Sequence, residues 1–381
     1  MAEHPTHDLF ADPATIGSLM DFRPAPDVLE LLALTERWLE PQRSIDALLE
    51  AQAQPAGYQV SAWNQCAELG LCSLLIDEAY GGTQMGLEAM CHLSEAFGRA
   101  LLASPHFAHA VLASDLLNLS EAEALKAQHL GAWAMGETCA TVASGGRSDW
   151  VDGTLSGTWD HVLHGDTADQ IVLTAHDQSG QPLILLLNAD AFERTVQHGL
   201  DQSRQRARLV LPRRPVDPSD VIASGEHAQR LVTLAQQRAQ VVLAYEQLGV
   251  AQACLDASLE YAKTRRQFGT IIGTFQAIKH LIADLYTQLE AARSAAVFAA
   301  WCADHEPEQL PFASLTAAQL AGDAAFQCAG QNIQIHGGIG FTWDHPAHLY
   351  FKRAQSNQHL LGCSLDQLDQ AARLLELEGG C

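Results

Sequence analysis

The chain has 381 residues, of which 48% are apolar and 18% are charged. This composition is typical of a globular protein with two or three domains, and it excludes an intrinsically disordered chain. Lys and Arg total 22 against 45 Asp and Glu, which gives a formal charge of −23. Because such an acidic surface repels the phosphate backbone of a nucleic acid, we expect no nucleic-acid partner.

Nine cysteines are scattered along the chain without a Cys-x-x-Cys pair. An odd number of scattered cysteines indicates free thiols in a reducing compartment, and argues against a disulfide framework or a zinc site. The first residues lack the basic start and apolar core of a signal peptide. No apolar run approaches about 18 residues, the length of a membrane span. We therefore expect a cytoplasmic protein with no membrane span and no metal site.

Taken in order, the chain divides into three parts. After about 25 residues with little periodicity, apolar residues recur at helical spacing up to about residue 130. Residues 155–187 instead contain short apolar runs separated by glycine-containing turns, which predict strands. Long helical periods return after about residue 226. The predicted domains are a helical domain over 1–130, a β domain over 131–222 and a helical bundle over 223–381.

The most informative stretch runs from residue 261 to residue 281. Before it, apolar residues between Leu231 and Leu259 recur at intervals of three and four, which predicts one long helix. Lys263, Arg265 and Arg266 lie in its last turn, where cations complement the helix dipole. A short glycine-containing loop follows, and then a new helix is expected.

Two sequence strings in this half resemble signatures of the flavin-dependent acyl-CoA dehydrogenase family. They are Arg-Arg-Gln-Phe-Gly at 265–269 and the stretch 331–354, which contains His-Gly-Gly-Ile-Gly; residues 67–82 resemble the family's amino-terminal segment. The resemblance covers nearly the whole chain. It implies a mostly α fold with an N-terminal helical domain, a middle β-barrel and a C-terminal four-helix bundle, in agreement with the three-part pattern. It also implies an enzyme that introduces an α,β double bond into an acyl-CoA thioester with FAD.

In this family, the C-terminal domain of one subunit reaches the ADP half of a flavin that is seated mainly in another subunit. An arginine suits the pyrophosphate, because it forms charge-assisted hydrogen bonds, and consecutive glycines let the backbone come close to the ligand. The resemblance places seven candidates for binding at this half: Arg265, Gln267, Phe268, Gln276, Gln334, Gly337 and Gly338.

The β domain departs from the family pattern where the flavin ring is normally held. The family's Thr-Glu-Pro turn and Trp-Ile-Thr strand correspond here to 134–138 and 161–165. His161 replaces the tryptophan, and Leu163 cannot donate the hydrogen bond of the threonine hydroxyl. Strand alternation would place Trp159 on the same face as His161, so that it could partly compensate.

The reaction also needs a carboxylate that removes the α-proton while hydride leaves the β-carbon. The two positions where the family carries this base hold Leu361 and Ala239. Glu246 is the leading substitute, because it lies two turns beyond Ala239 and within about 20° of the same helix face. The alternative is that Glu246 bonds a neighbouring helix or a partner's arginine.

The sequence leaves several readings open. The favoured one is a subunit of a heterotetramer, in which a homologous chain carries the base and holds the flavin ring; such pairs resemble the bacterial dehydrogenases that act on steroid side-chain CoA esters. The other is a self-sufficient homotetramer that uses Glu246. A non-catalytic scaffold, an acyl-CoA oxidase and a flavin monooxygenase also stay open. The resemblance further implies electron-transfer flavoprotein as the electron acceptor, and the acyl group is not specified.

Overall fold

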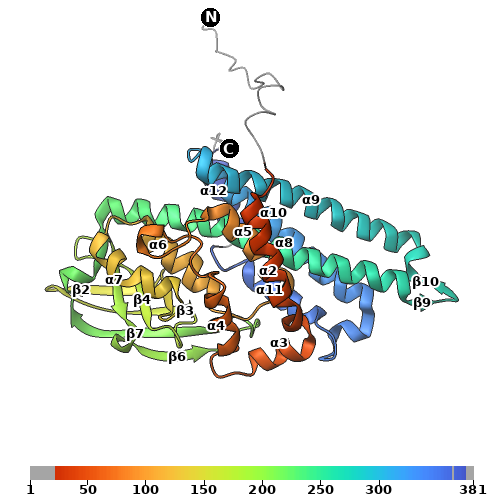
Figure 1. Ribbon diagram of the computed structural model, residues 1–381, viewed down its shortest axis with the longest axis horizontal. Helices are drawn as coiled ribbons and strands as arrows, with labels where there is room; N and C mark the ends of the chain where they lie inside the picture. Colours follow the sequence, from red (N-terminus) through yellow and green to blue (C-terminus); the bar gives the residue numbers. More distant parts are fainter. Residues whose placement is uncertain (1–21, 363, 375–381) are drawn as a thin grey trace, which may run out of the picture.

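The computed structural model describes residues 22–362 and 364–374, without the side chains of residues 364–367. Helices come first, strands follow, and long helices complete the chain. The strands between residues 140 and 224 gather at one end of the molecule, and the long helices extend away from them (Figure 1). The predicted order of helices, strands and helices is confirmed.

The amino-terminal part consists of α2 (Pro26–Leu39), α3 (Ile45–Gln52), α4 (Val60–Glu68), α5 (Gly86–Ala100), the π-helical segment η3 (Phe107–Ser114), α6 (Asp115–Leu119) and α7 (Glu123–Ala134). Two glycines permit the contact of α5 with the long helix α8 (Gly225–Thr264). A Cβ at Gly98 would lie 2.0 Å from the carbonyl oxygen of Glu246, and a Cβ at Gly249 would lie 2.0 Å from that of Glu95. Only a residue without a side chain fits at either point, so the two helix backbones can cross closely.

The strands of the middle part form two four-stranded sheets, ordered β1-β4-β5-β8 and β2-β3-β7-β6. Apolar side chains of both sheets share one core, which includes Trp159, Leu173, Leu185 and Leu209. The sequence predicted a β-barrel in this part. Within the described residues, its strands instead pair in two separate sheets that pack on one another. The strands are β1 (Ala140–Ala143), β2 (Arg147–Val151), β3 (Thr154–Leu163), β4 (Gln170–His176), β5 (Pro182–Asn188), β6 (Glu193–Gln197), β7 (Arg206–Pro215) and β8 (Val221–Ser224).

The carboxy-terminal part comprises α8, α9 (Gln276–His305), α10 (Leu310–His336), α11 (Ala347–Asn357) and α12 (Ser364–Leu374). Helices α8, α9 and α10 pack against one another along their length (Figure 1). The buried face of α9 carries Ala292, Ala296 and Ala299 at helical spacing, and α10 contributes Ala317 and Ala321. Such small side chains let the helices approach closely.

Helix α7 ends at Ala134 and α8 begins at Gly225. These limits lie near the predicted domain boundaries, which stay predictions. None of the helices in the described ranges is long and apolar enough to cross a membrane. Within the same ranges, His, Cys, Asp and Glu side chains form no group of three that could hold a metal ion.

Candidate functional site

The first signature string forms a short hairpin at the end of α8. Strands β9 (Arg266–Gln267) and β10 (Thr270–Ile271) pair antiparallel, and the two residues between them, Phe268 and Gly269, have φ angles of 51° and 80°. A left-handed conformation at both positions is the geometry of a type I′ turn, which costs a phenylalanine more than a glycine. The Phe268 side chain is 93% exposed. A large apolar ring held outward by a strained turn indicates a contact with something outside the chain.

Arg265 directly precedes this hairpin, and its backbone N–H donates to the Tyr261 carbonyl over 2.8 Å at the end of α8. Its side chain is exposed. The neighbouring Lys263 pairs with Glu260 at 2.7 Å, whereas no carboxylate in the described ranges pairs with Arg265. In a chain of net charge −23, this arginine is therefore available to an anion.

The second signature string forms the end of α10 and the turn η7 (Gly337–Phe341). Gly337 has a φ of 67°, and a Cβ added at Gly337 or Gly338 would meet no atom within 4 Å. Gln334, one turn earlier on α10, is exposed. The two glycines thus present open backbone on the protein surface, beside an exposed amide.

The two strings meet at the same end of the bundle. The rings of Tyr261 and His336 stack with their centroids 4.2 Å apart, which joins the last turn of α8 to the last turn of α10. Below them, Ala262, Ile272 and Ile335 form a small buried cluster. Gln276 begins α9 beside the hairpin; its side chain is exposed, and its Nε2 lies 3.4 Å from the His280 ring.

These residues fit the ADP half of FAD. An unpaired guanidinium suits a pyrophosphate, and two glycines with open space before them provide backbone that a ligand can approach without meeting a side chain. The exposed Phe268 ring is an apolar surface of the kind that a nucleoside packs against. The seven ADP-side candidates are therefore at one end of the molecule, exposed and not enclosed by their own chain.

Glu246 lies roughly 28 Å from Arg265 along the axis of α8. Its carboxylate is 4% exposed and belongs to a buried ion cluster. Oε1 lies 2.9 Å from Nη1 of Arg353 and accepts a hydrogen bond of 3.1 Å from the Asn357 amide, while Oε2 pairs with Arg204. Both carboxylate oxygens are thus occupied by groups of the same chain.

The cluster continues through Arg353 into the β region. Nε of Arg353 lies 2.9 Å from Oδ2 of Asp201, and Nη2 donates to Ser203 Oγ over 2.6 Å and to the Leu102 carbonyl over 3.2 Å. Arg204 also donates to Asn357 Oδ1 over 2.8 Å. The cluster therefore joins the loop before β7, the end of α5, α8 and α11. Sequence reasoning missed it, because no local spacing links Arg204 to Glu246, 42 positions away, or Arg353 to Asp201, 152 positions away.

Burial and charge act in opposite directions on these carboxyl groups. Burial alone would raise the pKa of Glu246, but Arg204 and Arg353 outweigh it and hold that pKa below its ordinary value. The pKa of Asp201 is lowered in the same way, chiefly by Arg353 against the effect of burial. A carboxylate that is stabilised as an anion is a weaker proton acceptor.

A separate cavity of about 430 Å³ lies where the amino-terminal helices, the β region and α8 meet. The side chains of Leu163 and Leu361, the positions of the expected threonine and base, both contribute to its wall. Ala239, the other base position, is fully buried. The cavity is lined by Leu112, Leu116, Val142, Ser144, Gly145, Asp160, His161, Val162, Leu163, Thr174, Val232, Ala235, Gln236, Leu360, Leu361 and Gly362.

The expectation that Trp159 shares a face with His161 is wrong. The pairing of β3 with β7 shifts register between Trp159 and Val162, and His161 has a φ of 60°. This bulge interrupts the alternation of side chains. Trp159 is consequently fully buried between the sheets and donates to the Thr174 carbonyl over 3.1 Å, whereas the exposed His161 borders the cavity.

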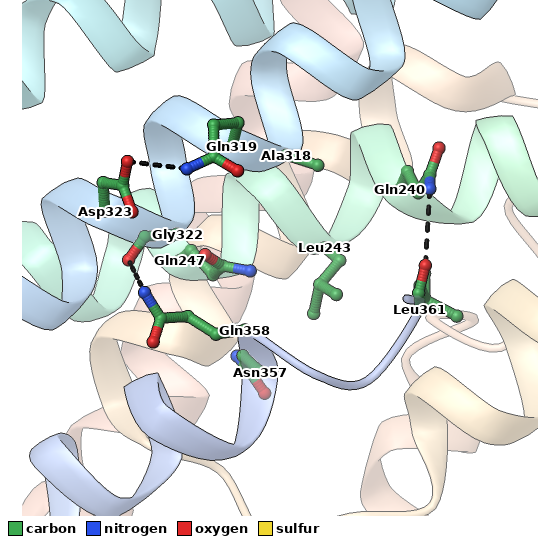
Figure 2. Close-up of a pocket in the computed structure, with 10 residues that line it drawn as sticks. All are labelled: Gln240, Leu243, Gln247, Ala318, Gln319, Gly322, Asp323, Asn357, Gln358 and Leu361. Carbon is green, nitrogen blue, oxygen red and sulfur yellow. Dashed lines mark hydrogen bonds between the residues drawn. The ribbon is translucent and has the colours of Figure 1, made fainter. Parts of the chain in front are cut away.

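A small polar gap lies between α8, α10 and residues 357–361, and a side chain that lines it holds the backbone of Leu361 (Figure 2). Gln240 Nε2 donates to the Leu361 carbonyl over 3.4 Å, and Gln358 Nε2 donates to the Gly322 carbonyl over 3.5 Å. The gap measures about 10 Å³, which is room for one water at most. These amides fix the segment that carries Leu361 and offer no space for a substrate.

Comparison with known proteins agrees with these features. The N-terminal domain model of acyl-CoA dehydrogenases matches residues 37–137, and the C-terminal domain model matches residues 228–375. Acyl-CoA dehydrogenase IpdE2 of Mycobacterium tuberculosis is 36% identical over 319 residues, which cover 83% of this chain and 86% of the relative. IpdE2 of Mycolicibacterium smegmatis is 30% identical over 345 residues, covering 89% and 94%.

Two solved structures are similar over almost their whole length. A chain of the ChsE4-ChsE5 complex from Mycobacterium tuberculosis has a TM-score of 0.86 and 26% identity, covering 95% of this chain and all of the other. A chain of a Tcur3481-Tcur3483 steroid ACAD variant has a TM-score of 0.81 and 26% identity, covering 92% and 98%. The chain belongs to the acyl-CoA dehydrogenase family, whose members are FAD-dependent oxidoreductases that act on CH–CH bonds.

Proposed function

We propose that this chain is one subunit of a heteromeric acyl-CoA dehydrogenase. In this arrangement it donates Arg265, Gln267, Phe268, Gln334 and the Gly337-Gly338 backbone to the ADP half of an FAD, while a homologous chain holds the flavin ring and carries the base. Bound FAD accepts the hydride that leaves the β-carbon of the thioester.

One contrast carries the proposal. The groups that a subunit offers to its neighbour are present, exposed and unpaired, as with Arg265 and Gly338. The groups that a subunit keeps for its own reaction are absent, since Leu361 and Ala239 occupy the two base positions. Glu246 is a poor replacement, because two arginines hold both of its oxygens. A subunit that both seats and uses its own flavin would need the second set of groups as well.

The relatives support the same arrangement. The ChsE4-ChsE5 and Tcur3481-Tcur3483 structures each pair two differently named chains, and the second is described as a steroid ACAD. We therefore propose a steroid-type acyl-CoA thioester as the substrate of the heteromer. Electron-transfer flavoprotein as the electron acceptor and a cytoplasmic location stay predictions.

The experiment that tests the proposal measures FAD per subunit by absorbance. The chain is purified alone, and also after co-expression with its nearest homologous neighbour. We expect no bound FAD in the chain alone and about one FAD per pair of chains in the complex. About one FAD per subunit in the chain alone would contradict the proposal and favour the self-sufficient homotetramer. No FAD in either preparation would favour a non-catalytic scaffold.

A further inference from the structure

The resemblance assigns the cavity of about 430 Å³ to the flavin ring and its base, because Leu163 and Leu361 stand at the positions of the family's threonine and base. Both leucines line this one space. With Val162 and Ala235 they belong to the apolar part of a lining that also includes Asp160, His161, Thr174 and Gln236.

Hydrogen bonds between neighbouring elements fix the walls of the cavity. Arg238 on α8 binds Asp115 on α6 through two hydrogen bonds of 2.7 and 3.0 Å, which fixes the distance between two of the walls. Thr141 Oγ1 donates to the Leu163 carbonyl over 2.6 Å, and Gln240 holds the Leu361 carbonyl. A largely apolar space of this size with a few polar groups has the usual form of a small-molecule site.

Three of the polar residues that line the cavity are exposed to solvent. They are Ser144, His161 and Gln236, and they can bond one polar group of a ligand. The charge of Asp160 is already engaged, by Arg208 over 2.6 Å and by Gln197 over 2.8 Å. A charged ligand would lose its hydration inside without gaining a partner, and the polar edge of a flavin ring would find no donor at Leu163.

We propose that this chain's own cavity binds an uncharged, mainly hydrocarbon ligand, either a fused ring system or a long alkyl chain, in place of a flavin ring. The inference rests on the proposed function, because it takes the flavin ring to be held by the other chain. The ligand would enter with its apolar part toward Leu163 and leave one hydroxyl or carbonyl group at His161 and Gln236.

The test is equilibrium dialysis with two radiolabelled probes, progesterone for a fused ring and 1-dodecanol for an alkyl chain. The full chain is measured alone and in the FAD-loaded complex. We expect saturable binding of at least one probe at one site per copy of this chain. Leu361→Glu and Ala235→Phe should each weaken this binding tenfold or more, while Leu29→Glu, a change at an exposed leucine of α2, should not. Leu361 lies in a half-exposed segment, so its variant remains informative if Ala235→Phe fails to fold.

Three results would overturn the inference. The first is that neither probe binds saturably, and the second is that binding survives both cavity variants in folded protein. The third is that the Ala235→Phe complex loses its FAD, which would place the flavin ring in this cavity. One FAD per pair of chains without probe binding would leave the proposed function standing and reject this inference alone. One FAD per subunit in the isolated chain would reject the proposed function first.

Discussion

Glu246 and Arg353 form a buried ion pair between α8 and α11, with Oε1 of the carboxylate 2.9 Å from Nη1 of the guanidinium. The two residues are only 4% and 2% exposed. Since Arg204 takes the second oxygen of Glu246, this carboxylate balances two buried cations. The geometry favours a structural role for Glu246, and its role as a displaced base stays a prediction.

Glu246→Gln should lower the free energy of unfolding by about 3–5 kcal/mol, because it leaves two buried arginines with one remaining counter-charge, Asp201. Urea unfolding at pH 7 measures this loss. The double variant Glu246→Gln with Arg204→Gln should lose less than the sum of the two single variants, since it removes one charge of each sign. Unchanged stability together with lost turnover of the complex would instead identify Glu246 as the base.

Arg265→Ala should reduce FAD retention of the complex without affecting the fold, because the side chain is exposed and its unpaired charge is assigned to the pyrophosphate. The measurement is FAD per pair of chains after gel filtration, with a loss of about tenfold or more in affinity expected from one charge-assisted hydrogen bond. Lys263→Ala is the matched control, since it removes a nearby cation that already pairs with Glu260. Equal FAD content in the Arg265 variant and the wild type would reject the assignment.

Gly338→Ala and Gly98→Ala should separate cofactor binding from folding. A Cβ at Gly338 meets no atom of the chain within 4 Å, so the variant should unfold as the wild type does and retain less FAD. A Cβ at Gly98 would lie 2.0 Å from the Glu246 carbonyl, so that variant should lose stability by forcing α5 from α8. Thermal unfolding and FAD content are measured for both. A Gly338 variant that unfolds early would show that this glycine serves the fold.

The sequence predicted the parts of this molecule that depend on local pattern. The glycine-containing loop after α8 and the helix that follows it were predicted from a short string, and α8 itself from apolar spacing; the β9–β10 hairpin within the loop was not predicted. Other features depend on contacts that spacing does not carry. The bulge after Trp159 exchanges the faces of β3, and Arg353 meets Asp201 across 152 positions. Pairing of the strands in two sheets, and not in a barrel, is likewise decided by distant contacts.

Acidification should destabilise the chain before its carboxylates are protonated, because of buried histidines. Burial lowers the pKa of both His106 and His109 to about 4. Burial keeps both rings neutral, although the hydrogen bonds to the Leu71 and Trp133 carbonyls favour the protonated form. His109 Nδ1 also accepts a hydrogen bond of 3.0 Å from the Ala140 N–H, which only the neutral ring can do.

The sign follows from proton uptake. Between about pH 6.5 and pH 4 these histidines are protonated in the unfolded chain but not in the folded chain. The free energy of unfolding should therefore fall with falling pH, by up to about 1.4 kcal/mol per pH unit for each histidine. Urea unfolding at half-unit steps across this window measures the slope. His109→Gln should make the slope shallower, because an amide can keep both hydrogen bonds but does not titrate, while His198→Gln at an exposed position should leave it unchanged. A slope in His109→Gln as steep as in the wild type would mean that His109 is not a source of the acid sensitivity.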